Sequence, residues 1–134
     1  MRSTQTVVEP WEPPPACLTL TRYFYTPQER PDALLRAQLE AARGKATPLL
    51  VRALAGPQEA AVLCLVSDLV AGLAAGPVPL DRSFFLTALN KGLFQIAAAE
   101  FHSFCYVEGK VDSRAWEKRR AEAFLFSRGR LLFE

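Results

Sequence analysis

The sequence predicts an all-α domain of about five helices packed around a central apolar helix at 57–75, preceded by an extended proline-rich N-terminal arm. From residue 26 onward, prolines and glycines alternate at the spacing of short helices, and Ser, Thr or Asp stands before most segments. Proline favours the first turn of a helix and glycine the position just past its end. One segment is apolar nearly all round, as expected for a buried helix. We therefore divide the chain into an arm, 1–25, and a helical domain, 26–134.

The arm is defined by its prolines, since six of the ten fall in the first 31 residues. The stretch EPWEPPP, residues 9–15, is predicted to be extended, because each proline fixes φ and pushes the residue before it out of the helical region. Residues 17–26, CLTLTRYFYT, mix β-branched and aromatic side chains. They predict either a short strand or an extended segment lying on the core or on a partner.

The first two helices of the domain are marked at both ends. Thr26 and Glu29 in TPQE have the spacing of a capping box, which predicts a helix over 26–43 that stops at Gly44. Thr47 then precedes a proline, which predicts a short helix that runs to Gly56.

The third helix is predicted over 57–75. The stretch from residue 60 to residue 80 carries a single charge, that of Asp68. Its sixteen residues from Ala60 to Ala75 span about 24 Å at ~1.5 Å per residue. A bilayer core needs ~30 Å, and a charge at its centre costs at least ~2.5 kcal/mol. The segment is therefore predicted to be the buried centre of the domain. Docking into a partner and membrane insertion are the less favoured alternatives.

Two helices complete the domain. The first is predicted over 82–107, behind Asp81, because apolar residues recur every three to four positions. The second is predicted over 113–127, with Asp112 or Ser113 as its cap and Gly129 past its end. The apolar face of the first is formed by Phe85, Leu89, Leu93, Ile96 and Phe104.

Composition limits the classes of function. With 50% hydrophobic and 22% charged residues, the 134-residue chain is globular rather than disordered. The net charge is only +2, but residues 110–134 hold seven basic against four acidic residues. Three widely spaced cysteines favour reduced thiols, and the N-terminal residues lack the apolar region of a secretory signal. We expect an intracellular protein, cytoplasmic or organellar.

No catalytic constellation stands out. Cys105 and His102 have the i, i+3 spacing that brings a thiol near an imidazole, but no orienting group accompanies them. Asp68, Glu100 and His102 are candidate metal ligands, but the Glu-Phe-His spacing places the last two on different helix faces. We expect no enzyme, cofactor, metal or small-molecule substrate. Thiol chemistry at Cys105 and His102 stays open.

Aromatic residues crowd both ends of the chain, and such residues are enriched at protein interfaces. The sequence therefore predicts a non-catalytic structural subunit that binds other proteins in a larger intracellular assembly. One alternative is an accessory protein, for example a peripheral ribosomal component, that contacts RNA through its basic C-terminal segment. A membrane-associated subunit of an organellar complex is the other, less favoured alternative. The predicted protein-binding residues are Trp11, Tyr23, Phe24, Tyr25, Trp116, Arg119, Arg120, Phe124 and Phe126.

Overall fold

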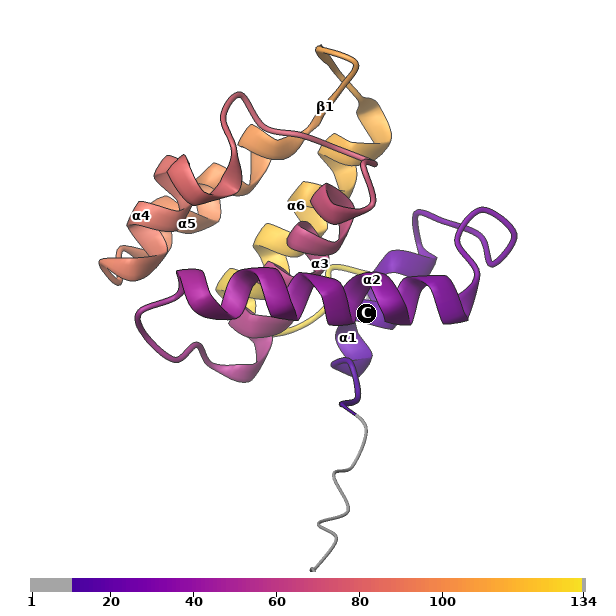
Figure 1. Ribbon diagram of the computed structural model, residues 1–134, viewed down its shortest axis with the longest axis horizontal. Coiled ribbons are helices and arrows are strands. Elements are labelled where there is room, and N and C mark those ends of the chain that lie inside the picture. Colours follow the sequence, from indigo (N-terminus) through magenta and orange to yellow (C-terminus); the bar gives the residue numbers. More distant parts are fainter. Residues whose placement is uncertain (1–10, 134) are drawn as a thin grey trace, which may run out of the picture.

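A computed structural model of the chain describes residues 11–133, and these residues form a mostly helical domain (Figure 1). The predicted all-α class is confirmed. The α-helices of the described part are α1 Pro15–Arg22, α2 Asp32–Ala46, α3 Gly56–Val70, α4 Phe84–Asn90, α5 Phe94–Glu100 and α6 Ser113–Arg128. Three single 3₁₀ turns, Thr47–Leu49, Leu80–Arg82 and Phe101–Phe104, and one hairpin of β1 Tyr106–Val107 and β2 Lys110–Val111 complete it.

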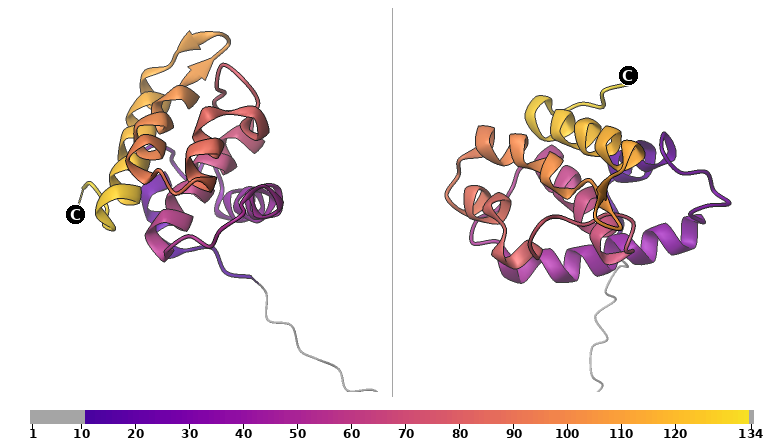
Figure 2. Two further views of the ribbon diagram at one scale, coloured as in Figure 1. Left: turned by 90° about the vertical axis from the view of Figure 1, so that its left-hand side faces the viewer. Right: turned by 90° about the horizontal axis from the view of Figure 1, so that it is seen from above.

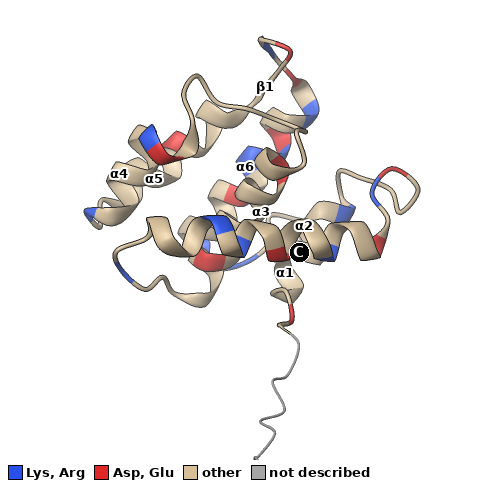
Figure 3. Cartoon of the chain, viewed as in Figure 1, with Lys and Arg blue, Asp and Glu red and all other residues tan. Residues whose placement is uncertain are grey.

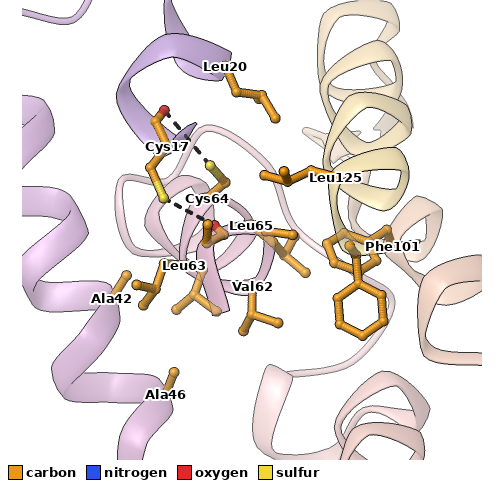
Figure 4. Packing of buried hydrophobic residues seen from close by; sticks show 14 of the residues in the cluster. Cys17, Leu20, Ala42, Ala46, Val62, Leu63, Cys64, Leu65, Phe101 and Leu125 are labelled. Carbon is orange, nitrogen blue, oxygen red and sulfur yellow. Dashed lines mark hydrogen bonds between the residues drawn. The ribbon is translucent and has the colours of Figure 1, made fainter. Parts of the chain in front are cut away.

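The centre of the domain is α3, as predicted. Every residue from Ala60 to Asp68 is buried, and α3 packs against α1, α2 and α6. Figure 4 shows Cys17 of α1, Ala42 of α2 and Leu125 of α6 converging on it. Among the described residues, no helix is both long enough and apolar enough to cross a membrane.

α3 ends at Val70, five residues earlier than predicted. Gly72 adopts a left-handed conformation with φ of 72°. Its N–H donates to the Leu69 carbonyl at 3.2 Å, and the N–H of Leu73 donates to the Asp68 carbonyl at 2.9 Å. These two bonds form a Schellman motif, which ends a helix at a glycine.

The prediction of one helix over 82–107 is wrong, because a second Schellman motif interrupts the chain at Gly92. Gly92 has a φ of 74°, and the Leu93 N–H donates to the Ala88 carbonyl at 2.9 Å. α4 therefore ends at Asn90, and α5 is a separate helix. Of the predicted apolar face, Phe85, Leu89 and Phe104 are buried. The prediction is wrong for Leu93 and Ile96, which follow the turn and are exposed. Figure 2 shows α4 and α5 as a folded-back pair beside α6.

Residues 106–111 form a hairpin, so the prediction that the helix continues to residue 107 is wrong. Tyr106 pairs with Val111 and Val107 pairs with Lys110. The two turn residues, Glu108 and Gly109, both have positive φ, as a tight hairpin turn requires.

The prediction of an extended arm or strand over 15–25 is wrong, because residues 15–22 form α1. Pro15 occupies the first turn of this helix, where its missing N–H costs nothing. Cys17, Leu20 and Thr21 follow the three-to-four spacing of one helix face and are buried. The predicted arm over residues 1–10 lies outside the described residues.

The first predicted helix begins later than expected. The capping box forms, since the Glu29 N–H donates to the Thr26 hydroxyl at 3.1 Å and the Thr26 N–H donates to the Glu29 carboxylate at 3.0 Å. It closes only one turn, because Pro31 disfavours a helical conformation at the residue before it. α2 starts at Asp32, after this proline, and it runs through the predicted stop at Gly44 to Ala46.

The structure also bears on the predicted ends of two further helices. The short helix predicted from Thr47 to Gly56 is reduced to the 3₁₀ turn Thr47–Leu49. The prediction for the last helix is confirmed: the Asp112 carboxylate accepts from the N–H of Ala115 at 2.9 Å, and Gly129 ends α6 with a φ of 74°.

A buried ion cluster connects the segment before α2 with α3 and α6, and Figure 3 shows the charged part of α6 beside α3. One Asp68 oxygen accepts from the Arg30 guanidinium at 2.7 Å, and the other lies 3.0 Å from the Lys118 ammonium. Arg119 donates to Asp68 and to Glu122. We call Arg30, Asp68, Lys118, Arg119 and Glu122 the ion cluster; each is at most 1% exposed.

The ion cluster holds three cations and two carboxylates. Neutral oxygen atoms accept further hydrogen bonds from its arginines. Arg30 also donates to the Gln38 amide oxygen at 2.8 Å, and Arg119 donates to the Phe104 carbonyl at 3.2 Å. Burial alone would raise the pKa of Asp68. The three buried cations outweigh burial and hold this pKa well below its ordinary value.

Asp68→Asn is expected to lower the free energy of unfolding by about 3–5 kcal/mol, because three buried cations would then share one carboxylate. Urea denaturation at pH 7 measures this change. The exposed Asp81→Asn is the matched control and should change stability by less than ~0.5 kcal/mol. Equal stability of the two variants would contradict the role given to Asp68.

The same cluster predicts acid sensitivity. Because the pKa of Asp68 is lower in the folded than in the unfolded chain, its contribution is present above the unfolded value of ~3.9 and is lost as the pH falls towards the folded value. The difference in unfolding free energy between wild type and Asp68→Asn, measured between pH 7 and pH 2, should therefore narrow as the pH falls. A difference that stays constant over this range would contradict the prediction.

Two glycines are expected to respond in opposite ways to alanine. An added Cβ at Gly76 would lie 2.6 Å from the Phe104 ring, so Gly76→Ala should cost about 1–3 kcal/mol. At Gly44, in α2, a Cβ meets nothing within 4 Å, so Gly44→Ala should stabilise by about 0.5–1 kcal/mol. Thermal unfolding of both variants tests the packing, and a change of the same sign would contradict it.

Candidate protein-binding surface

Aromatic side chains from both ends of the described chain meet on the surface. Gly129 turns the chain after α6, and Leu131 is buried, which anchors the tail. The tail runs back along α6 in the right-hand view of Figure 2. The ring of Phe133 then lies 4.8 Å from that of Tyr23 and 6.1 Å from that of Phe24, between ring centres. Tyr23 is 51% exposed and Phe133 is 46% exposed.

A hollow of about 390 Å³ adjoins the Tyr23 side chain. Its lining combines the apolar side chain of Leu18 with Arg22 and Asp32, whose charged groups are 4.0 Å apart. Arg22 also donates to the Arg30 carbonyl at 2.8 Å and so holds the loop between α1 and α2. We call Leu18, Thr19, Arg22, Tyr23, Phe24, Asp32 and Phe133 the Tyr23 surface.

The other predicted N-terminal residues contribute to packing. Tyr25 is buried, with the guanidinium of Arg114 4.1 Å from its ring centre on one side and that of Arg30 5.2 Å away. Burial, followed by the charge of Asp68, raises the pKa of Tyr25. Trp11 is half-buried under Arg43, whose guanidinium lies 5.2 Å from its ring.

The predicted C-terminal residues divide into three groups by their exposure. Arg119 and Phe126 are buried, the former in the ion cluster and the latter against Phe94 and Phe101, so neither lies on the surface of this conformation. Trp116 and Arg120 are exposed on α6, where Trp116 packs against His102 and Arg120 donates to the Glu117 carboxylate at 3.2 Å. Phe124 is half-buried, and Arg130 lies 5.3 Å from its ring.

Sequence reasoning missed the part of the Tyr23 surface that depends on the returning tail. Tyr23 and Phe133 are 110 positions apart, so no local pattern predicts their contact. The apolar ending LLF was the available signal, since such a segment is expected to dock on the core. Of the residues lining the hollow, Tyr23 was predicted, whereas Leu18, Thr19, Arg22 and Asp32 gave no signal of their own.

Cys105 and His102 do not form a thiol–imidazole pair. Cys105 lies after the 3₁₀ turn that contains His102, and no hydrogen bond joins them among the described residues. The imidazole instead packs against Trp116, with ring centres 5.0 Å apart. Burial lowers the pKa of His102 and raises the pKa of Cys105, which is the opposite of what an activated thiol needs.

The two carboxylates that were candidate metal ligands, those of Asp68 and Glu100, bind different partners. Asp68 belongs to the ion cluster, whereas Glu100 accepts a hydrogen bond from the Ser103 hydroxyl at 2.8 Å. Within residues 11–133, no group of three or more His, Cys, Asp or Glu side chains is arranged to hold a metal ion.

Comparison with known proteins gives no assignment. No family model matches the chain, and no curated protein matches its sequence.

Cys105 should react slowly with iodoacetamide at neutral pH, because its thiol is buried and its pKa is raised. We expect native labelling at least about 100-fold slower than labelling in denaturing urea, limited by local opening. Peptide mapping by mass spectrometry separates Cys105 from Cys17 and Cys64. Native labelling of Cys105 faster than in urea would restore the thiol hypothesis.

Proposed function

We propose that this protein is a non-catalytic subunit of a larger assembly and that it binds a partner protein through the Tyr23 surface. The observation that carries this proposal is the meeting of Tyr23, Phe24 and Phe133 beside an adjoining hollow. Tyrosine and phenylalanine are enriched in the cores of protein interfaces, where burial of their rings supplies much of the binding energy.

The hollow suits a protein partner because it combines apolar and charged groups. A side chain placed over Leu18 and Tyr23 would lose contact with water, which favours binding. Arg22 and Asp32 at its edge offer one charge of each sign, so a partner can hydrogen-bond there and be held in one orientation.

The Tyr23 surface is also pre-ordered, which lowers the entropic cost of binding. The Arg22 guanidinium holds the α1–α2 loop through two backbone carbonyls, those of Tyr25 at 3.4 Å and Arg30 at 2.8 Å. The buried side chain of Leu131 fixes the tail that carries Phe133.

RNA contact has less support than the sequence suggested. Of the five basic residues at 118–130, Lys118 and Arg119 are buried in the ion cluster, where carboxylates neutralise them. Phosphate contacts need exposed cations. We therefore propose protein binding alone.

Tyr23→Ser combined with Phe133→Ser tests the proposal. Wild-type protein should elute from size-exclusion chromatography of a cell extract far above its 14.9 kDa, together with stoichiometric partners identified by mass spectrometry. The double variant should elute at monomer size, because losing interface aromatics costs about 2 kcal/mol or more each.

Phe84→Ser is the matched control, because Phe84 is an aromatic residue on α4 that is 57% exposed. Circular dichroism should show the same helix content for all three proteins. Wild-type protein that elutes as a monomer, or a double variant that elutes with the same partners as wild type, would refute the proposal.

A further inference from the structure

The loop that follows α2 is held by one side chain from α4. The Asn90 amide oxygen accepts from the Val51 N–H at 3.0 Å, and the Asn90 amide nitrogen donates to the Leu49 carbonyl at 2.9 Å. This one amide side chain therefore supplies the hydrogen-bond partners of one backbone N–H and one backbone carbonyl of the loop. The loop consequently has a defined conformation although it contains no regular secondary structure beyond the 3₁₀ turn.

The fixed loop presents an apolar side chain to solvent. Val51 is 76% exposed, the highest value among the exposed large apolar side chains of the described residues. Leu93, just past the α4–α5 turn, is 44% exposed. A single exposed valine is ordinary on a protein surface, so Val51 gains significance only from what surrounds it.

Arg52 is held beside it with its terminal nitrogens free. Its Nε donates to the Asn90 carbonyl at 3.3 Å. The guanidinium lies across Gly92, where an added Cβ would come within 2.6 Å of an Arg52 nitrogen. Within residues 11–133, the two terminal nitrogens make no hydrogen bond or ion pair. A guanidinium held in this way is ready to bind a carboxylate through two parallel hydrogen bonds.

A hollow lies under the same loop. It measures about 390 Å³, and Leu50 and Leu54 supply much of its apolar lining. The same two leucines also line a smaller inner cavity of about 70 Å³. Arg52 and Glu59 are the charged residues of the outer hollow, and Lys91 is exposed on the adjoining α4–α5 turn.

We propose that this site binds an acidic, apolar peptide segment of a partner protein. A carboxylate of the segment pairs with Arg52, and a neighbouring apolar side chain covers Val51 and enters the hollow over Leu50 and Leu54. Charge complementarity selects this ligand, because Arg52 and Lys91 outnumber the single carboxylate of Glu59. A nucleic acid fits less well, since two cations beside exposed apolar side chains are a poor match for a phosphate backbone.

This site is distinct from the Tyr23 surface and does not rest on it. Asp32 of the Tyr23 surface stands at the first residue of α2, and Thr47 of the hollow directly follows its last. The fifteen residues of α2 span roughly 22 Å at ~1.5 Å per residue, and this length separates the two sites.

The test selects twelve-residue peptides from a phage-displayed random library on the immobilised full chain. We expect the enriched peptides to carry Asp or Glu next to a large apolar residue. By fluorescence polarisation, the same synthetic peptides should bind Arg52→Gln at least about tenfold more weakly than wild type, and Val51→Ser more weakly as well. The affinity of Arg52→Lys should lie between those of Arg52→Gln and wild type. Lysine keeps the positive charge but cannot form the two parallel hydrogen bonds that a guanidinium makes to a carboxylate.

Arg128→Gln is the matched control: it removes an exposed cation from the last turn of α6 and should leave the affinity unchanged. Circular dichroism and thermal unfolding verify that each variant is folded. Three results would each overturn the proposal: enrichment of peptides without acidic residues, equal binding to wild type and Arg52→Gln, or failure to enrich any binder. Tighter binding of a twelve-nucleotide single strand than of the peptides, lost in Arg52→Gln, would assign the site to nucleic acid instead.

Discussion

The contact on which the rest of the structure depends is made by a single carboxylate, that of Asp68. It stands in the most apolar helix of the domain and receives Arg30 from the segment before α2 and Lys118 and Arg119 from α6. A buried charge is stable only when it is paired and hydrogen-bonded. The central helix therefore requires both neighbouring segments to be in place, and each of them requires α3. Apolar packing is non-directional and would allow the helices to shift along one another. The hydrogen bonds and ion pairs to Asp68 form only when Arg30, Lys118 and Arg119 stand at their observed positions.

That requirement explains which parts of the structure could be predicted from sequence. The burial of α3 and the ends of α6 follow from local patterns: an apolar run, an Asp at the start and a glycine at the end. The ion cluster does not, because its members lie up to 92 positions apart and a run such as KRR ordinarily marks a solvated helix face. Arg119 was for that reason expected on the surface, yet it lies at the centre. Tyr23 and Phe24 were identified, but their contact with Phe133 depends on how the tail folds back.

The helix boundaries that were missed have a common cause, which is the ambiguity of a glycine inside an apolar pattern. Gly72 and Gly92 both adopt positive φ and end helices, although the three-to-four spacing of apolar residues continues past each of them. Periodicity correctly placed Phe85 and Leu89 in the core, but it does not report that the chain turns at Gly92, and Leu93 and Ile96 beyond that turn are exposed. Likewise, Pro13-Pro14-Pro15 predicts extended backbone up to its last member, and that last proline is also a favoured first residue for α1.

The two proposed binding sites stand at opposite ends of α2, and both are kept in shape by side chains that bond to backbone groups of a loop. Arg22 holds the loop before α2 through two carbonyls, and Asn90 holds the loop after it through an N–H and a carbonyl. Pre-ordered loops lose little entropy on binding, so modest contact areas can give useful affinity. Because α2 is a single uninterrupted helix, the spacing between the sites is rigid. A partner that engages both ends would bind the second site at a high effective concentration, and a partner with a different spacing would gain nothing from the second site.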